Sequence, residues 1–66
     1  MSVVKVIEVL AESGKSWEDA AAVAIDKASK SVHGIKSIYI QDFEAKVEGG
    51  KIVKYRINAK ISFALD

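Results

Sequence analysis

Residues 35–65 decide the fold. They read IKSIYIQDFEAKVEGGKIVKYRINAKISFAL. Two runs rich in β-branched and aromatic residues flank the pair Gly49-Gly50, and a glycine pair in that setting is a strong signal for a two-residue hairpin turn. The sequence therefore predicts a long antiparallel hairpin, with strands over residues 35–47 and 51–65.

The alternation of side chains indicates which face of the hairpin is buried. In the last strand the apolar set is Tyr55, Ile57, Ala59, Ile61, Phe63 and Leu65, and the polar set is Lys54, Arg56, Asn58, Lys60 and Ser62. In the preceding strand the alternation changes phase at Gln41-Asp42. We expect a β-bulge at that point, because one extra residue returns the apolar side chains to the same face.

Two more elements precede the hairpin. Residues 3–10 consist mainly of Val, Ile and Leu and predict a strand with both faces largely covered. Residues 12–15 predict a loop. Residues 17–32 combine many alanines with apolar side chains at helical spacing, so they predict a helix.

The ends of this helix have recognisable signals. Ser16 is the expected N-cap, with Asp19 three residues later as in a capping box. Gly34 is the expected C-terminal stop, and His33 is expected to cap the last carbonyl groups. Trp17 is expected to be partly buried against a neighbouring subunit, because Trp is enriched at interface hot spots.

The predicted fold class is α+β with the order β-α-β-β, a three-stranded antiparallel sheet wrapped against one helix, in a single domain over residues 1–66. A helix of about 25 Å is too short to cover strands that reach about 40 Å. The chain has no cysteine, so no disulfide compensates for the small core. The uncovered sheet and its free edges therefore predict a homo-oligomer.

Charge and hydropathy argue against several classes of partner. The net charge of +1 predicts no strong attraction to nucleic acid or to an anionic membrane. Lys54, Arg56 and Lys60 form a basic stripe, but Tyr55 and Phe63 point to the opposite face, so a stripe facing water or an internal cavity is favoured over an RNA surface. No run is apolar enough to span a membrane and no signal peptide is visible, so a cytoplasmic protein is expected.

No catalytic residues are predicted, and an enzyme is not expected. His33 is the only histidine, and no nucleophile–base pair is visible. Gly14-Lys15-Ser16 lies between a strand and a helix, as a phosphate-binding loop does, but Val9 stands where the full motif requires Gly. A turn followed by an N-cap is therefore the favoured interpretation, and an anion at the helix N-terminus is the weaker alternative.

Several short motifs resemble those of the dodecin family. They are VKVIE at residues 4–8, SWEDAA at 16–21, YRI at 55–57 and ISF at 61–63, and the resemblance covers essentially the whole chain. It implies a hollow homododecamer with helices outside and sheets lining the cavity. Dodecins sequester or store flavin, FMN or riboflavin, and are not enzymes, so the resemblance implies self-association and a small-molecule ligand.

The resemblance also places candidate site residues. The family's flavin-stacking tryptophan falls on Ser37 and its hydrogen-bonding glutamine on Arg56, so these are the candidate cofactor-binding positions, in altered form. The chain resembles most closely the calcium dodecin branch, which lacks that tryptophan. Asp42 falls where a family member carries an acidic residue associated with ions, which makes it the candidate ligand for Ca²⁺ or Mg²⁺; its alternative role is to bond the backbone of the bulge.

Two functional hypotheses follow. The first is a dodecin-like shell that binds or stores a small ligand, with flavin contacts altered at Ser37 and Arg56. The second is a structural or Ca²⁺-stabilised dodecameric assembly without bound flavin.

Overall fold

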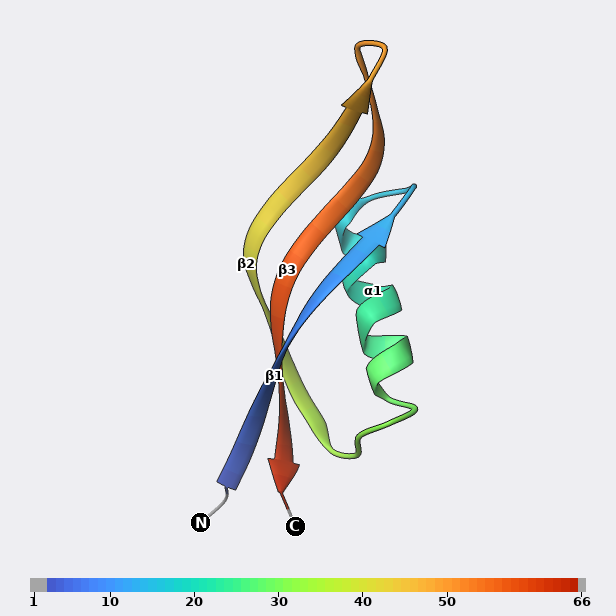
Figure 1. Ribbon diagram of the computed structural model, residues 1–66. Coiled ribbons are helices and arrows are strands. Elements are labelled where there is room, and N and C mark those ends of the chain that lie inside the picture. Colours follow the sequence, from blue (N-terminus) through green and yellow to red (C-terminus); the bar gives the residue numbers. More distant parts are fainter. Residues whose placement is uncertain (1–2, 66) are drawn as a thin grey trace.

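The computed structural model describes residues 3–65, which form one helix and three strands. Their order is β1 (Val3–Ser13), α1 (Trp17–Ala28), β2 (Ile35–Glu48) and β3 (Lys51–Leu65). Both strand pairings are antiparallel, and β3 lies between β1 and β2, with α1 against one face of the sheet (Figure 1). The predicted β-α-β-β architecture is confirmed.

The hairpin forms as the sequence predicts. Gly49 and Gly50 both have positive φ angles, +59° and +74°, as a type I′ turn requires. The bulge is also confirmed, because the pairing passes from Ile40 opposite Ala59 to Asp42 opposite Asn58 and leaves Gln41 as the extra residue. The apolar side chains of β2 therefore stay on one face along its length.

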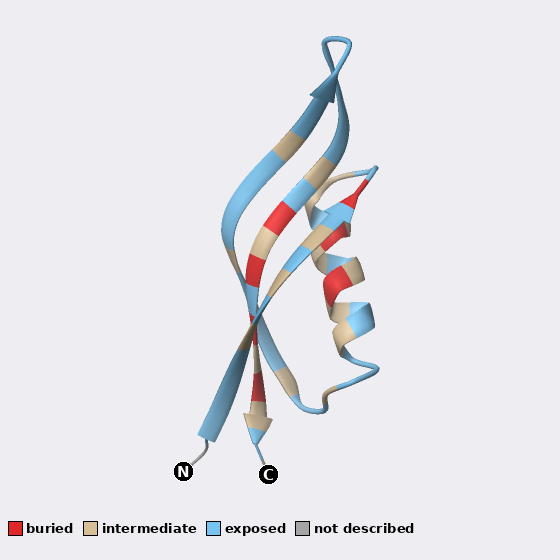
Figure 2. Ribbon diagram, viewed as in Figure 1, coloured by how far each residue is buried: buried red, intermediate tan, exposed pale blue. Residues whose placement is uncertain are grey.

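The core lies between the middle of β3 and α1. Ala20, Ile57, Ala59 and Ile61 are completely buried, and Phe63 nearly so. The buried residues alternate along β3 and sit on the inward side of the helix (Figure 2). Alanine at the contact lets the helix approach the sheet closely, because it adds little side-chain bulk.

Both ends of the helix are capped, one of them differently from the prediction. Ser16 is the N-cap, and its Oγ accepts a 2.9 Å hydrogen bond from the Asp19 amide. The predicted extension to Val32 is wrong, since α1 ends at Ala28. Ser29 caps it, because its amide and its hydroxyl both donate to the Ile25 carbonyl, at 2.9 and 2.7 Å. A serine hydroxyl that binds a helix carbonyl competes with the regular hydrogen-bond ladder.

The segments on either side of the helix also differ from expectation. Residues 12 and 13 were expected in a loop, but β1 continues through them, pairing Glu12 with Arg56 and Ser13 with Tyr55. Gly34 has the positive φ angle expected of it, +69°, but it lies beyond the capped helix, at the entry to β2. Its carbonyl accepts a 3.0 Å hydrogen bond from the Ala64 amide.

The helix covers only part of the sheet. Twelve residues of α1 span about 18 Å, whereas the molecule is 51 Å long. The hairpin arm, residues 46–53, extends past the helix (Figures 1 and 2). Its exposed large apolar residues are Val47, Ile52 and Val53. An apolar groove of about 560 Å³ also opens between α1 and the edge strand β1.

The one helix among residues 3–65 is too short and too polar to cross a lipid bilayer.

Candidate functional site

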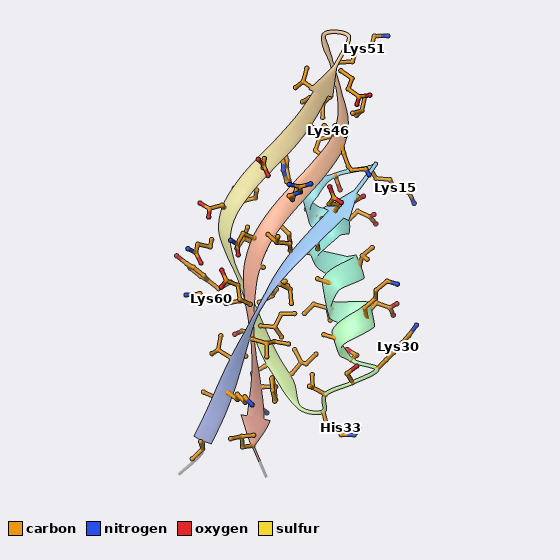
Figure 3. The ribbon with its side chains drawn as sticks, in the orientation of Figure 1. Lys15, Lys30, His33, Lys46, Lys51 and Lys60 are labelled. Carbon is orange, nitrogen blue, oxygen red and sulfur yellow. The ribbon has the colours of Figure 1, made fainter. Side chains whose placement is uncertain are left out.

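The candidate site lies on the open face of the sheet, which is the face that α1 does not cover. Side chains of even number on β1 and β3 point there, and the bulge brings those of β2 into phase with them. Lys60, on this face, points away from the helix (Figure 3). The polar residues that the open face gathers are Glu8, Glu12, Ser37, Tyr39, Asp42, Glu44, Lys46, Lys54, Arg56, Asn58, Lys60 and Ser62.

Arg56 links the three strands through two carboxylates. Its Nη2 and Nε donate to Glu12 Oε2 on β1, at 2.8 and 3.2 Å, and its Nη1 donates to Glu44 Oε1 on β2, at 3.3 Å. The hydrogen bond from Arg56 lowers the pKa of Glu12, helped by the charges of Arg56, Lys54 and Lys46. The same bond raises the pKa of Arg56, so both groups are charged at neutral pH.

Ser37 lies at the other end of the open face. Its hydroxyl shares a 2.6 Å hydrogen bond with Ser62, its partner on β3. Ser62 and Arg56 are six positions apart on that strand, which corresponds to about 20 Å. Ser37 and Arg56 therefore share a face but not a pocket within one chain.

Asp42 lies beside the bulge and opposite Asn58. Both residues line an open hollow of about 310 Å³, together with Leu10, Phe43, Glu44 and Arg56. The Oδ1 atom of Asn58 is buried and accepts no hydrogen bond, which is rare for a buried polar atom. No group of three or more acidic or histidine side chains that could hold a metal occurs within residues 3–65.

Trp17 packs against its own chain. Its ring meets those of Tyr55 and Phe43 edge-on, with centroid distances of 4.9 and 5.8 Å, and its Nε1 donates a 3.0 Å hydrogen bond to the Glu44 carbonyl. Trp17 therefore fixes the start of α1 to the hairpin. Contact with a neighbouring subunit stays a prediction.

The segment before the helix behaves as a turn. The Ser13 hydroxyl donates to Asp19 Oδ2 at 2.6 Å and accepts from the Lys15 amide at 2.9 Å. The Ser16 hydroxyl caps the helix, so these side chains serve local structure rather than a phosphate. His33 is exposed on the connection to β2 (Figure 3), and the capping role predicted for it belongs to Ser29.

Two residues of the open face, Tyr39 and Glu12, were not predicted from the sequence, and neither was one property of a third, Asn58. Tyr39 is 65% exposed and lies two positions after Ser37, on the same face, which the period of two could have revealed. Glu12 lies on this face because β1 continues past residue 10, whereas the sequence predicts a loop over residues 12–15. Asn58 was placed correctly on the polar face, but its buried oxygen depends on packing between strands and has no local signal.

The chain resembles known proteins along its whole length. The family model described as Dodecin matches residues 3–66. Calcium dodecin from Mycobacterium tuberculosis is 37% identical over 65 residues, which cover 98% of this chain and 92% of that protein.

Solved structures agree with this match. A crystal structure of the M. tuberculosis calcium dodecin, described as having a novel calcium-binding site, aligns with a TM-score of 0.83 and 39% identity, covering 98% of this chain and 93% of that one. Dodecin from Streptomyces davaonensis aligns with a TM-score of 0.92 at 20% identity, covering 98% and 96%. At that identity the second likeness speaks for the fold alone.

Proposed function

Because this chain belongs to the dodecin family, we propose that it is a subunit of a closed homododecameric shell that binds a small ligand or ion and performs no catalysis. The observation that carries the proposal is the mismatch between one short helix and a long sheet. Large apolar side chains remain exposed on the edge strands and the arm, including Leu10, Phe43 and Val47 at 60% or more. Exposure of this kind marks an interaction surface.

The apolar groove between α1 and β1 supports the same conclusion. A chain of 66 residues buries too little surface to be very stable alone, and a second copy of the chain would cover both the groove and the edge of β1. Symmetric self-association is the commonest way to cover such surfaces.

Light scattering coupled to size exclusion tests the assembly. Twelve chains of 7.2 kDa give a particle of about 86 kDa. A stable monomer at micromolar concentration would contradict the proposal.

Calcium is the ion that we assign to this shell, at Asp42. Ca²⁺ takes about six to eight oxygen ligands, including carboxylates and side-chain amide oxygens. Asp42 offers a carboxylate, and Asn58 offers the buried oxygen that lacks a partner. One chain supplies too few ligands, so copies of the chain would share the ion at a symmetry axis. The name of the M. tuberculosis relative, calcium dodecin, agrees with this assignment, and Mg²⁺ is the competing ion.

Calorimetric titration with CaCl₂ tests this assignment. The native protein should bind Ca²⁺ and lose thermal stability in EDTA, because an ion that binds only the folded state stabilises it. Asp42→Asn should abolish both effects. Asp26→Asn, an exposed aspartate on α1, is the control and should leave them unchanged. Equal loss in the two variants, or no Ca²⁺ effect in the native protein, would refute the assignment.

Flavin storage is the second candidate, and Tyr39 favours it. Ser37, at the family's stacking position, has no aromatic ring, but Tyr39 presents one on the same face two residues away. A tyrosine ring can stack on FMN or riboflavin, although it is smaller than an indole. Arg56 of another copy would complete such a pocket, since one chain does not bring Arg56 near Ser37. Quenching of flavin fluorescence on titration with the protein tests this candidate.

A further inference from the structure

The carboxylate of Glu12 is surrounded by cationic side chains. Arg56 donates two hydrogen bonds to its Oε2 atom, and Lys46 and Lys54 line the same hollow, of about 200 Å³. Three cationic groups from β2 and β3 thus share the hollow with two carboxylates, Glu12 of β1 and Glu44 of β2. Such a cluster is the usual recognition element for phosphate and sulfate groups.

The two lysines are placed in an unfavourable way. Lys46 and Lys54 stand directly opposite each other in the pairing of β2 with β3, and like charges in that position destabilise a sheet. Lys46 is 3.6 Å from Glu48, whereas Lys54 forms no ion pair within residues 3–65. A negatively charged group in the hollow would relieve the repulsion between Lys46 and Lys54.

We propose that Glu12 sets the ligand selectivity of this pocket: its tethered carboxylate occupies the place that a phosphate or sulfate group would take, so the native pocket excludes free phosphate and sulfate.

The geometry around Arg56 explains the exclusion. All three guanidinium nitrogens donate to carboxylates, two to Glu12 and one to Glu44. The side-on pair formed by Nε and Nη2 is therefore occupied by Glu12 and is not available for bidentate binding of an external anion. A tethered group also acts at an effective concentration on the order of millimolar, which a free anion must exceed.

Removing the charge of Glu12 should open the pocket. Only Glu44 among the residues lining it would then face three cationic side chains. The Nε and Nη2 donors of Arg56 would be free to point at one sulfate oxygen pair. Glu44 is bound by a single, longer contact of 3.3 Å and its side chain is 65% exposed, so it is the weaker of the two internal anions.

This inference rests on the proposed ligand role of Arg56. Its test uses sulfate alone and needs neither flavin nor calcium, so the inference and the proposed function can fail separately.

The test is a sulfate titration of Glu12→Gln, followed by calorimetry at constant ionic strength. Glu8→Gln is the matched control, because Glu8 lies on the same strand and face but pairs with Lys60. Sulfate should bind Glu12→Gln about tenfold or more tightly than it binds the native protein or Glu8→Gln. The added change Lys54→Met should weaken that binding again.

Two results would overturn the inference. One is sulfate binding by the native protein that equals that of Glu12→Gln; the other is no sulfate binding by folded Glu12→Gln. Circular dichroism and light scattering verify the fold and the assembly. If the glutamine variant does not fold, Glu12→Thr replaces it, because a β-branched residue suits a strand and equally removes the charge.

Discussion

Trp17 Nε1 donates a hydrogen bond of 3.0 Å to the carbonyl oxygen of Glu44, across 27 positions of the chain. This bond joins the first residue of the helix to the edge strand of the hairpin. It gives the backbone carbonyl of Glu44 a hydrogen-bond donor from the helix, and the indole ring lies edge-on to Tyr55.

Replacing Trp17 by Phe should separate the hydrogen bond from the ring packing. The variant keeps an aromatic ring but no N–H donor, and we expect the free energy of unfolding to fall by about 1 kcal/mol. Urea denaturation at fixed protein concentration measures the change. Tyr39→Phe is the control, because the Tyr39 hydroxyl makes no hydrogen bond within the described chain. A Trp17→Phe protein as stable as the native one would show that the bond contributes nothing.

Gly34 is predicted to be intolerant of a side chain. Its φ angle is +69°, and a Cβ atom there would lie 3.6 Å from the Ala64 Cβ, so the space suffices and the backbone conformation is the obstacle. Gly34→Ala should cost about 1–2 kcal/mol of stability. Gly14→Ala should cost much less, because Gly14 does not have a positive φ angle and an added Cβ atom would have no neighbour within 4 Å. Thermal unfolding of the two variants compares them, and equal melting points would contradict the prediction.

Acid should weaken the link between Glu12 and Arg56. The folded pKa of Glu12 lies below its ordinary value of 4.5, chiefly because of the hydrogen bond from Arg56. The link therefore adds stability above that value, and the contribution is lost as the pH falls through the folded pKa. The difference in stability between the native protein and Glu12→Gln should shrink on acidification below about pH 4.5, and also in 1 M salt. Parallel pH profiles for the two proteins would exclude this role of the link.

Ser37→Trp should strengthen flavin binding if the open face holds a flavin. An indole at that position provides a stacking surface beside Tyr39, and aromatic stacking contributes roughly 0.5–1.5 kcal/mol, or about two- to twelvefold in affinity. Riboflavin fluorescence quenching measures the change. Lys30→Trp, on the connection between α1 and β2 and with a side chain 74% exposed, is the control for an added indole elsewhere. A gain of equal size in the control would mean that stacking at residue 37 is not responsible.

Much of the fold could be predicted because its signals are local. The glycine pair sets the hairpin, and the alternation along residues 51–65 gives both the bounds and the buried face of β3. The phase change at Gln41 locates the bulge, since side chains two residues apart must share a face. Two further register irregularities, near Lys36 and Val53, were missed, although the apolar residues change parity there too, from Ile35 to Ile38 and from Ile52 to Tyr55.

The rest depends on contacts between distant residues. The end of α1 is set by the Ser29 hydroxyl, which a helical pattern of alanines does not reveal. The partners of Arg56 are 44 and 12 positions away, so its engagement with two carboxylates follows from the strand order and not from its neighbours in sequence. The separation of Ser37 from Arg56 likewise becomes visible only when the register is known.

The extra residue Gln41 reverses which side chains of β2, odd-numbered or even-numbered, point to a given face of the sheet. Between residues 37 and 40, even-numbered residues face the helix; downstream of Gln41, odd-numbered residues do. Deleting Gln41 would leave the hairpin turn intact. It would move each side chain between the deletion and the turn to the opposite face of the sheet. Phe43 would leave the aromatic cluster around Trp17, and Asp42 and Glu44 would turn from the open face toward the helix. A single position thus determines which side chains of β2 after residue 41 face the helix and which lie on the open face.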